Sequence, residues 1–234
     1  MMFYHRCLLT LACFVSALPV FAGAPDAIPA DQYQKQLFED DFSKPKLGKQ
    51  WNLYKSSSVV KEGVLQGVEL KDGGHAAVHQ LRTEPYSDVE LTVDLKFAGS
   101  PYTNLTFNQH KFKGSHAGHL CRVVISPTKI TLRDGKTGVF NNEIFKKRRA
   151  KEKLTSEEQA ILKRTQAVFP VKLEKDKWYT VTVRIKGDLM QAFIDGKIIG
   201  SLRSPGIAHA TKDKIGLVTP KQSIHYDNVK VRVP

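Results

Sequence analysis

The segment from Trp178 to Gly200, "WYTVTVRIKGDLMQAFIDGKIIG", constrains the fold more than any other part of the chain. Apolar and polar residues alternate along it, and the dipeptides Gly187-Asp188 and Asp195-Gly196 interrupt it at short intervals. A period of two predicts β-strands with one buried side, and such dipeptides favour tight hairpins. The segment therefore predicts three consecutive antiparallel strands.

A second segment, "DVELTVDLKF" at Asp88–Phe97, alternates in the same way. Its expected buried face consists of Val89, Leu91, Val93, Leu95 and Phe97. The dipeptides Asp72-Gly73 and Asp134-Gly135 predict further hairpin turns. Many short strands without a strand–helix–strand rhythm are typical of an all-β sandwich.

The first 24 residues resemble a secretory signal peptide. A short basic start, "MMFYHR", precedes the apolar run "CLLTLACFVSALPVFA", and small residues follow at Ala22–Ala24. A permanent anchor is the alternative, but Pro19 and the small residues favour cleavage. We therefore expect a secreted or periplasmic protein in which residues 25–234 form one β-sandwich domain. We expect no membrane span once the signal peptide is removed.

The chain is strongly basic, with 36 Lys and Arg against 23 Asp and Glu, a formal net charge of +13. Such a field favours anionic partners, among them acidic glycans and nucleic acid. Because export is expected, we predict a saccharide or anionic glycan as the partner and no nucleic acid. The sequence does not indicate the oligomeric state.

Residues 141–167, "NNEIFKKRRAKEKLTSEEQAILKRTQA", interrupt the strand pattern. They contain good helix formers, and Thr155 with Glu158 form a capping box before an apolar run. This predicts a helical insertion, with two short helices, between strands of the sandwich. Its "KKRRAKEK" could bind an acidic polymer, or it could be an ordinary solvated helix face.

Three carboxylates lie on one side of a predicted strand, at Asp88, Glu90 and Asp94. A pair of carboxylates about 5–9 Å apart is what most glycosidases use, so this spacing is compatible with a sandwich glucanase. Thr92 occupies the position where a further acid would complete such a pattern. The polar outer face of an amphipathic strand has the same appearance.

The stretch "FNQHKFKGSHAGHL" contains His110, His116 and His119, and no Asp or Glu occurs between Asp94 and Asp134. A zinc site needs at least three converging ligands, often supported by a carboxylate, and the neighbouring lysines would repel a cation. Histidine can instead transfer a proton near neutral pH without any carboxylate. A glycine-bearing surface loop is the third interpretation.

The strands on either side of this stretch carry polar residues on one face. Asn104, Thr106 and Asn108 share a face of "YTNLTFN", as amides and hydroxyls do in sugar sites and also on ordinary wet sheets. Cys121, the only cysteine outside residues 1–24, alternates with Val123 and Ile125, which predicts a buried thiol. Arg122 is then expected on the opposite face, with Leu120 and Val124.

Two further histidines occur in "GGHAAVHQL", at His75 and His79. Each lies next to a predicted strand of mixed polarity. We expect them at strand edges or half-buried, and not as metal ligands.

The order of segments resembles the concanavalin A-like secreted domains called 3-keto-disaccharide hydrolase domains. The segments that carry the resemblance are "LFEDDF…W", "VVKEGVLQG", "LRTEPYSDVELTVDLKF", "NLTFNQH", "GHLCRVVI", "KWYTVTVRIKGDLMQAFIDGKIIG" and "IHYDNVKVRV". Laminin-G-like and laminarinase-like domains share this general outline. The resemblance implies a jelly-roll β-sandwich with a saccharide cleft on its concave sheet.

The resemblance also implies site residues. The family carries an Asn-Ser-Gly…Arg strand followed by Gly-Tyr-Glu-x-Gln, and Asn104 and Gly118 match its Asn and Gly. The remaining positions differ, as His110 stands for Arg, His119 for Tyr, Leu120 for Glu and Arg122 for Gln.

Family chemistry needs one base and one group that stabilises an enolate, because a ketone at C3 of a glycoside acidifies the C2 proton. We expect His110 or His119 as the base and Arg122 as the cation, with Asn104 and Asn108 binding the sugar and with no metal or cofactor. The predicted function is a carbohydrate-active hydrolase or lyase that acts on 3-keto-glycosides. The alternative is a non-catalytic glycan-binding or cell-envelope module, since Leu120 replaces the family's acid.

Overall fold

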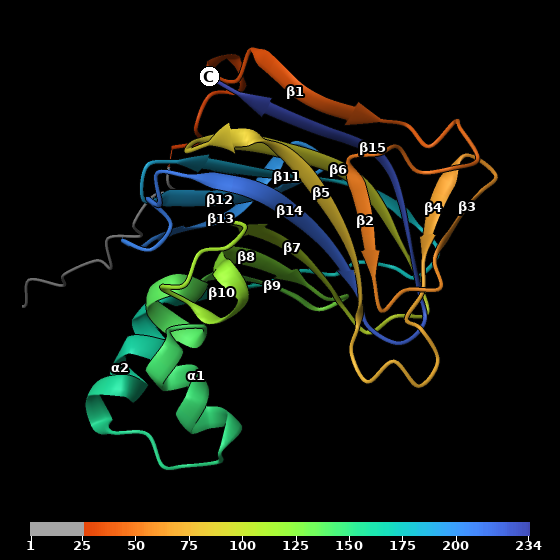
Figure 1. Ribbon diagram of the computed structural model, residues 1–234. Helices are drawn as coiled ribbons and strands as arrows, with labels where there is room; N and C mark the ends of the chain where they lie inside the picture. The colour runs from red at the N-terminus through yellow and green to blue at the C-terminus, as the bar shows by residue number, and fades with distance from the viewer. Residues whose placement is uncertain (1–25) are drawn as a thin grey trace, which may run out of the picture.

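The computed structural model describes residues 26–234, so the predicted signal peptide at residues 1–24 lies outside the described residues. Two curved antiparallel β-sheets pack face to face, and a pair of short helices lies beside one of them (Figure 1). The architecture is the predicted all-β jelly-roll sandwich. No helix within residues 26–234 is both long and apolar enough to cross a membrane.

The first sheet, sheet A, contains eight strands of the described chain. In spatial order they are β13 (Lys197–Arg203), β12 (Leu189–Ile194), β11 (Trp178–Lys186), β6 (Val89–Ala98), β15 (Ser223–Val233), β4 (Val64–Gly67) and β3 (Val59–Lys61), with β1 (Lys35–Asp40) paired to β15. The strand next to the C-terminus thus pairs with the strand nearest the start of the described chain.

The second sheet, sheet B, contains seven strands within residues 26–234. Their order is β10 (Gln166–Pro170), β9 (Lys129–Asp134), β8 (His119–Ile125), β7 (Thr103–Asn108), β14 (Lys212–Thr219), β5 (Ala77–Tyr86) and β2 (Trp51–Tyr54). The helical elements are η1 (Ala30–Gln32), η2 (His116–Gly118), η3 (Gly135–Val139), α1 (Asn142–Arg149) and α2 (Ser156–Arg164).

The two hairpins predicted in the opening segment are confirmed. β11 and β12 are joined across Gly187-Asp188, and β12 and β13 across Asp195-Gly196, where both residues have positive φ. The turns predicted at Asp72-Gly73 and Asp134-Gly135 are not hairpins. The former lies in the longer β4–β5 connection, and the latter begins η3, where Thr137 N donates to the Asp134 carboxylate and turns the chain toward α1.

The core lies between the two sheets, as the alternating pattern predicts. The buried side of β6 consists of Val89, Leu91, Val93, Leu95 and Phe97, each at most 2% exposed. Sheet B contributes Leu105, Phe107 and Val123 from its inner face, and Cys121 is a buried free thiol among them. Apolar packing of two amphipathic sheets therefore holds the sandwich together.

A β-bulge interrupts the pairing of β7 with β8. Phe107 pairs with Cys121, but the next pair is Asn108 with His119, so Leu120 has no partner across the ladder. Leu120 is fully buried, but it does not belong to the apolar cluster between the sheets that contains Cys121 and Val123. The extra residue reverses the face of His119, which lies beyond it and which strict alternation would place on the inner face with Cys121.

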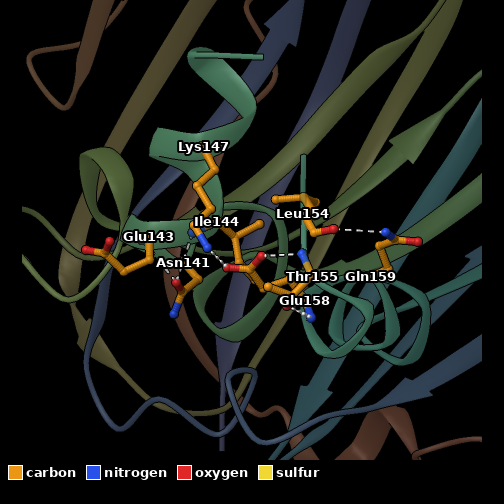
Figure 2. A network of polar contacts seen from close by, with 8 residues as sticks. All are labelled: Asn141, Glu143, Ile144, Lys147, Leu154, Thr155, Glu158 and Gln159. Atoms are coloured by element: carbon orange, nitrogen blue, oxygen red, sulfur yellow. Dashed lines mark hydrogen bonds and ion pairs between the residues drawn. The ribbon is translucent and has the colours of Figure 1, made fainter. Parts of the chain in front are cut away.

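The predicted helical insertion is present as α1 and α2, although Gln166 and Ala167 already belong to β10. The Thr155–Glu158 capping box at the start of α2 is confirmed in both directions. The same Glu158 carboxylate also accepts a 2.6 Å contact from Lys147 of α1, which ties the two helices together (Figure 2). Asn141 caps α1 by accepting from Glu143 N. The insertion is thus fixed by its own polar contacts.

Core burial can be tested by replacing two leucines that differ in exposure. Leu95 is 0% exposed, whereas Leu70 is 42% exposed. Leu95→Ala should lower the free energy of unfolding by about 2–5 kcal/mol, because the truncation leaves a cavity between the sheets. Leu70→Ala should change it by about 0.5 kcal/mol. Urea unfolding of both variants measures the difference, and equal effects would contradict the assigned core.

Candidate functional site

A cleft of about 720 Å³ opens on the face of sheet B that is turned away from sheet A. Small-molecule sites have volumes of about 300–1,000 Å³, so the cleft has the size of a ligand site. Strands β5, β14, β7 and β8 form its floor, and the insertion contributes to its wall. Asn104, Thr106 and Asn108 point into it from β7, while Leu105 and Phe107 point into the core.

One row of paired residues crosses the floor. Gln80, Gly216, Thr106 and Arg122 lie opposite one another on β5, β14, β7 and β8. A Cβ atom at Gly216 would come within 2.5 Å of the Thr106 hydroxyl. The glycine therefore leaves the middle of the floor open, where a side chain would fill it.

His119 is held by a chain of hydrogen bonds along this floor. The Asn108 amide nitrogen donates to Thr106 Oγ1 at 2.9 Å, and the Asn108 amide oxygen lies 2.9 Å from His119 Nδ1. An amide oxygen can only accept, so Nδ1 carries the proton and Nε2 keeps a free lone pair. Asn108 thereby sets the His119 tautomer.

The surroundings of His119 keep it neutral. Its ring stacks on Phe140, with centroids 4.4 Å apart. Burial, and then the positive charges of Arg122 and Lys214, lower the pKa of His119 from 6.5 to about 3. At neutral pH the imidazole is therefore an unprotonated group that can take up a proton, although its basicity is reduced.

Arg122 is a cation without a counterion. Its guanidinium lies 4.7 Å from the centre of the Phe140 ring. Its Nε is buried with no hydrogen-bond partner, and in the described part of the chain no carboxylate forms an ion pair with it. Burial, followed by the charge of Arg133, lowers the pKa of Arg122 to about 10, so it stays charged at neutral pH.

Asn104 offers a second unsatisfied group. Its side chain is 8% exposed and lines the cleft, yet its Oδ1 accepts no hydrogen bond. A buried amide oxygen without a partner costs free energy, which a ligand hydroxyl would recover by donating to it.

The wall of the cleft is built by the insertion and the loop before β8. The ring of His116 stacks on that of Phe145 in α1, with ring centroids 3.6 Å apart and an angle of 12° between the ring planes. The backbone N of His116 donates to Phe140 O. Gly118 precedes His119 with φ at +72°, which a side chain would strain. Arg149, from the last turn of α1, also lines the cleft.

The cleft is lined by cations and by no acid. Arg122, Arg149 and Lys214 are its charged residues, and within residues 26–234 no Asp or Glu lines it. The sequence does not predict Lys214 and Arg149 as cleft residues, because both lie far from His119 along the chain. The alternation in "KDKIGLVT" and the basic run of the insertion were the only signals for them.

The structure brings four of the five predicted site residues together. Asn104, Asn108, His119 and Arg122 line the cleft, whereas His110 does not. The His110 backbone N donates to Asp213, and its ring lies 3.3 Å from Arg82 on the rim of sheet B. Of the two candidate bases, only His119 lines the cleft together with Arg122.

The histidines of "GGHAAVHQL" have different surroundings. His79, predicted at a strand edge or half-buried, is instead fully buried within β5, with Nδ1 2.9 Å from Leu217 O and Nε2 2.7 Å from Ser58 Oγ. Burial lowers the pKa of His79 to about 4, which fits a neutral structural residue. His75, predicted at a strand edge or half-buried, is instead exposed in the loop before β5, where it lines the cleft beside Tyr54.

The three carboxylates predicted on one strand belong to the other sheet: Glu90 and Asp94 lie in β6, and Asp88 directly precedes it and accepts from Gly187 N. Glu90 pairs with Arg184 at 2.7 Å, and Asp94 accepts from Thr180 Oγ1 at 2.6 Å. Because these acids are engaged and none lines the cleft, they do not form a two-carboxylate glucanase site there. Among the described residues, no group of three or more His, Cys, Asp or Glu side chains is placed to hold a metal ion.

Comparisons with known proteins place the fold. The chain is 14% identical to SCLam, a non-specific endo-beta-1,3(4)-glucanase, with a TM-score of 0.60 over 89% of this chain and 93% of that one. It is 12% identical to carbohydrate-binding module CBM66 from Bacillus subtilis, with a TM-score of 0.51 over 78% and 95% of the two chains.

A sialidase is 15% identical, with a TM-score of 0.58 over 88% of this chain, which spans only 19% of the sialidase. These likenesses show a shared fold. A search of curated protein sequences finds no match.

A family description matches nearly the whole described chain. Residues 35–232 match the "3-keto-alpha-glucoside-1,2-lyase-like domain". This match agrees with the resemblance that the order of the sequence segments indicates. The chain therefore belongs to this family, and its fold is the jelly-roll sandwich shared by concanavalin A-like glucanases and lectins.

Proposed function

We propose that the cleft binds a saccharide that already carries a ketone at C3. The bound saccharide then loses its C1 substituent by elimination. One observation carries this proposal: a neutral histidine with a fixed tautomer and a cation without a counterion face the same acid-free cleft. We further propose that the protein acts after export, on saccharides outside the cytoplasm.

The first step needs a base. A ketone at C3 acidifies the proton on C2, and His119 Nε2 is free to take it because Nδ1 donates to Asn108. The low pKa of His119 keeps it in the unprotonated form, at the expense of basicity. The negative charge that develops on the substrate beside the new imidazolium offsets part of this loss.

The second requirement is a group that stabilises the enolate. When the C2–H bond breaks, its electron pair moves toward the C3 oxygen, which becomes negatively charged. Arg122 can bind that oxygen without first giving up an ion pair, since no carboxylate of the described chain holds it. A preorganised cation in a partly desolvated site stabilises such charge better than water does.

Elimination completes the reaction. The enolate electrons form the C1–C2 double bond and the C1–O bond breaks, which releases the aglycone oxygen. The imidazolium of His119 then returns its proton to that oxygen, so the products are an enone sugar and an alcohol. No carboxylate pair is needed, in agreement with a cleft that has no acid.

Sugar recognition is supported by the remaining lining. Tyr54 and Tyr102 are 45% and 39% exposed and lie in the cleft, where flat aromatic rings can cover the apolar face of a pyranose. Asn104 Oδ1 accepts no hydrogen bond from the protein. Gln80 adds a second amide to the cleft floor, from strand β5. Directional amides and aromatic faces together are typical of saccharide sites.

A non-catalytic glycan-binding module is the second candidate. Leu120, which occupies the position of the family's acid, is fully buried in the bulge and offers no chemistry. A binding module would use Asn104, Tyr54 and Tyr102 but would not depend on the His119 lone pair. The two candidates therefore differ in their response to substitution of His119.

Substitution of the two central residues tests the elimination. His119→Gln and Arg122→Gln should each lower the rate of aglycone release from a 4-nitrophenyl 3-keto-glucoside by about 10²–10³-fold, because each removes a base or an enolate-binding cation. His110→Gln is the matched control and should keep the wild-type rate, since His110 lies outside the cleft.

Three variants with the same rate would contradict the catalytic roles. If the wild type releases no aglycone but binds oligosaccharides on a glycan array, the binding module is correct.

Asn108→Ala should affect kcat more than KM, because loss of the amide frees the His119 tautomer without removing a sugar-binding cation.

The pKa of His119 predicts a dependence of stability on pH. Unfolded His119 takes up a proton near pH 6.5, but folded His119 stays neutral until about pH 3. The unfolded state therefore gains protons first, and stability falls as the pH drops from 6.5 toward 3. Relative to His119→Gln, the wild type should lose free energy of unfolding between pH 7.5 and pH 4.5 in urea titrations. An equal difference between the two proteins at both pH values would contradict the neutral state.

A further inference from the structure

A second hollow, of about 220 Å³, lies between sheet B and the helical insertion. Arg133 of β9 and Arg148 of α1 line it, together with Leu162, Thr165 and Gln166. It is smaller than the about 300–1,000 Å³ of most small-molecule sites, but it has room for one charged substituent, since a water occupies about 30 Å³ of liquid. Val139 lines this hollow and the adjacent Phe140 lines the cleft, so the two openings are neighbours separated by the chain.

Arg133 continues the row of residues that crosses the floor of the cleft. It lies directly opposite Arg122 on β8 and opposite Gln166 on β10. Paired strands are about 4.8 Å apart, so two guanidinium side chains leave the same face of the sheet next to each other. Like charges placed opposite each other across a sheet are destabilising.

No protein group compensates this charge. Within residues 26–234, no carboxylate forms an ion pair with Arg122, Arg133 or Arg148. The Nε atoms of Arg122 and Arg133 are buried without a hydrogen-bond partner. Burial and the charge of Arg148 lower the pKa of Arg133. An unpaired, partly buried cation is costly, and an anion in the hollow would remove that cost.

One carboxylate, that of Asp134, also lines the hollow, but its oxygens are already engaged. Asp134 accepts from Thr137 N and Oγ1, from Ser204 Oγ and from Gly206 N, which satisfies both of its oxygens. It leaves the strand on the side opposite to Arg133 because successive strand residues alternate. Asp134 therefore fixes the turn into the insertion and leaves the guanidinium of Arg133 free.

A contact between the two helices fixes the segment of α1 that carries Arg148. Lys147 contacts Glu158 of α2, which is itself part of the capping box (Figure 2). The next two residues, Arg148 and Arg149, then line the second hollow and the cleft respectively. Three consecutive basic residues of α1 thus have three separate surroundings. Arg148 and Arg149 are exposed residues of the helix, and Lys147 is half-buried.

We propose that the second hollow is an oxyanion site in which Arg133 and Arg148 hold a sulfate or carboxylate group of an acidic saccharide. Guanidinium groups suit such groups because their donors match two oxygens at once. That the anion belongs to a saccharide rests on the proposed function; the anion site itself does not.

Calorimetric titration of the whole chain tests the site. The probes are inorganic sulfate, a glucuronate-containing disaccharide, a sulfated disaccharide and a neutral disaccharide. The wild type should bind sulfate and at least one acidic disaccharide, and should bind the neutral one more weakly. Arg133→Gln and Arg148→Gln should each weaken binding of the anions by about tenfold or more, the loss of one charge-assisted hydrogen bond.

Arg164→Gln is the matched control, because it removes the same charge from the same insertion at an exposed position. It should retain wild-type affinity. Equal losses in all three variants, or no saturable binding by the wild type, would overturn the site. Binding of inorganic sulfate without either acidic disaccharide would overturn its assignment to a saccharide.

Two further readouts distinguish an anion site from a pair of arginines that only supports the fold. Without an anion, Arg133→Gln should keep or raise the Tm, whereas replacing a purely structural arginine would lower it. Turnover of a neutral 3-keto-glucoside should be unchanged in Arg133→Gln and Arg148→Gln. Failure of turnover in the wild type would therefore refute the elimination and leave anion binding to be judged on its own result.

Discussion

The bulge at Leu120 determines what the cleft can do. Without it, His119 would share the inner face with Cys121 and would point into the core. With one extra residue in β8, His119 pairs with Asn108 on the outer face and joins Arg122 there. Leu120, the extra residue, is fully buried. One extra residue in β8 thus places an imidazole and a guanidinium on the same side of the sheet.

The helical insertion completes the environment that the sheet begins. Phe140 covers both His119 and Arg122, and Phe145 stacks on His116. These rings exclude water from the imidazole and from the guanidinium, which is why burial is the main cause of both lowered pKa values. Since no carboxylate of the described chain lies beside them, the positive charges are not neutralised. The cleft is consequently suited to negative charge, whether it develops in a reaction or arrives with a ligand.

Much of the fold could be predicted from local patterns. The alternation along β6 and β11, the two hairpins, the buried Cys121 and the capping box of α2 follow from the sequence because each depends on neighbouring residues. The cleft could be predicted only in part. Asn104 and Asn108 share a face by alternation, but the face of His119 depends on a bulge that no residue type announces. Lys214 and Arg149 depend on strand order and on the rotation of α1, which local patterns do not determine.

The energetic balance of the cleft argues against a site that only holds a neutral sugar. Such a site needs amide and aromatic contacts, which Asn104, Tyr54 and Tyr102 supply. A guanidinium could donate to the hydroxyls of such a sugar, but a neutral amide could do so without burying a charge. Keeping Arg122 charged and unpaired there lowers stability, whereas a neutral side chain of similar size would avoid the cost. A ligand or a transition state that carries negative charge, as we propose, would offset this cost.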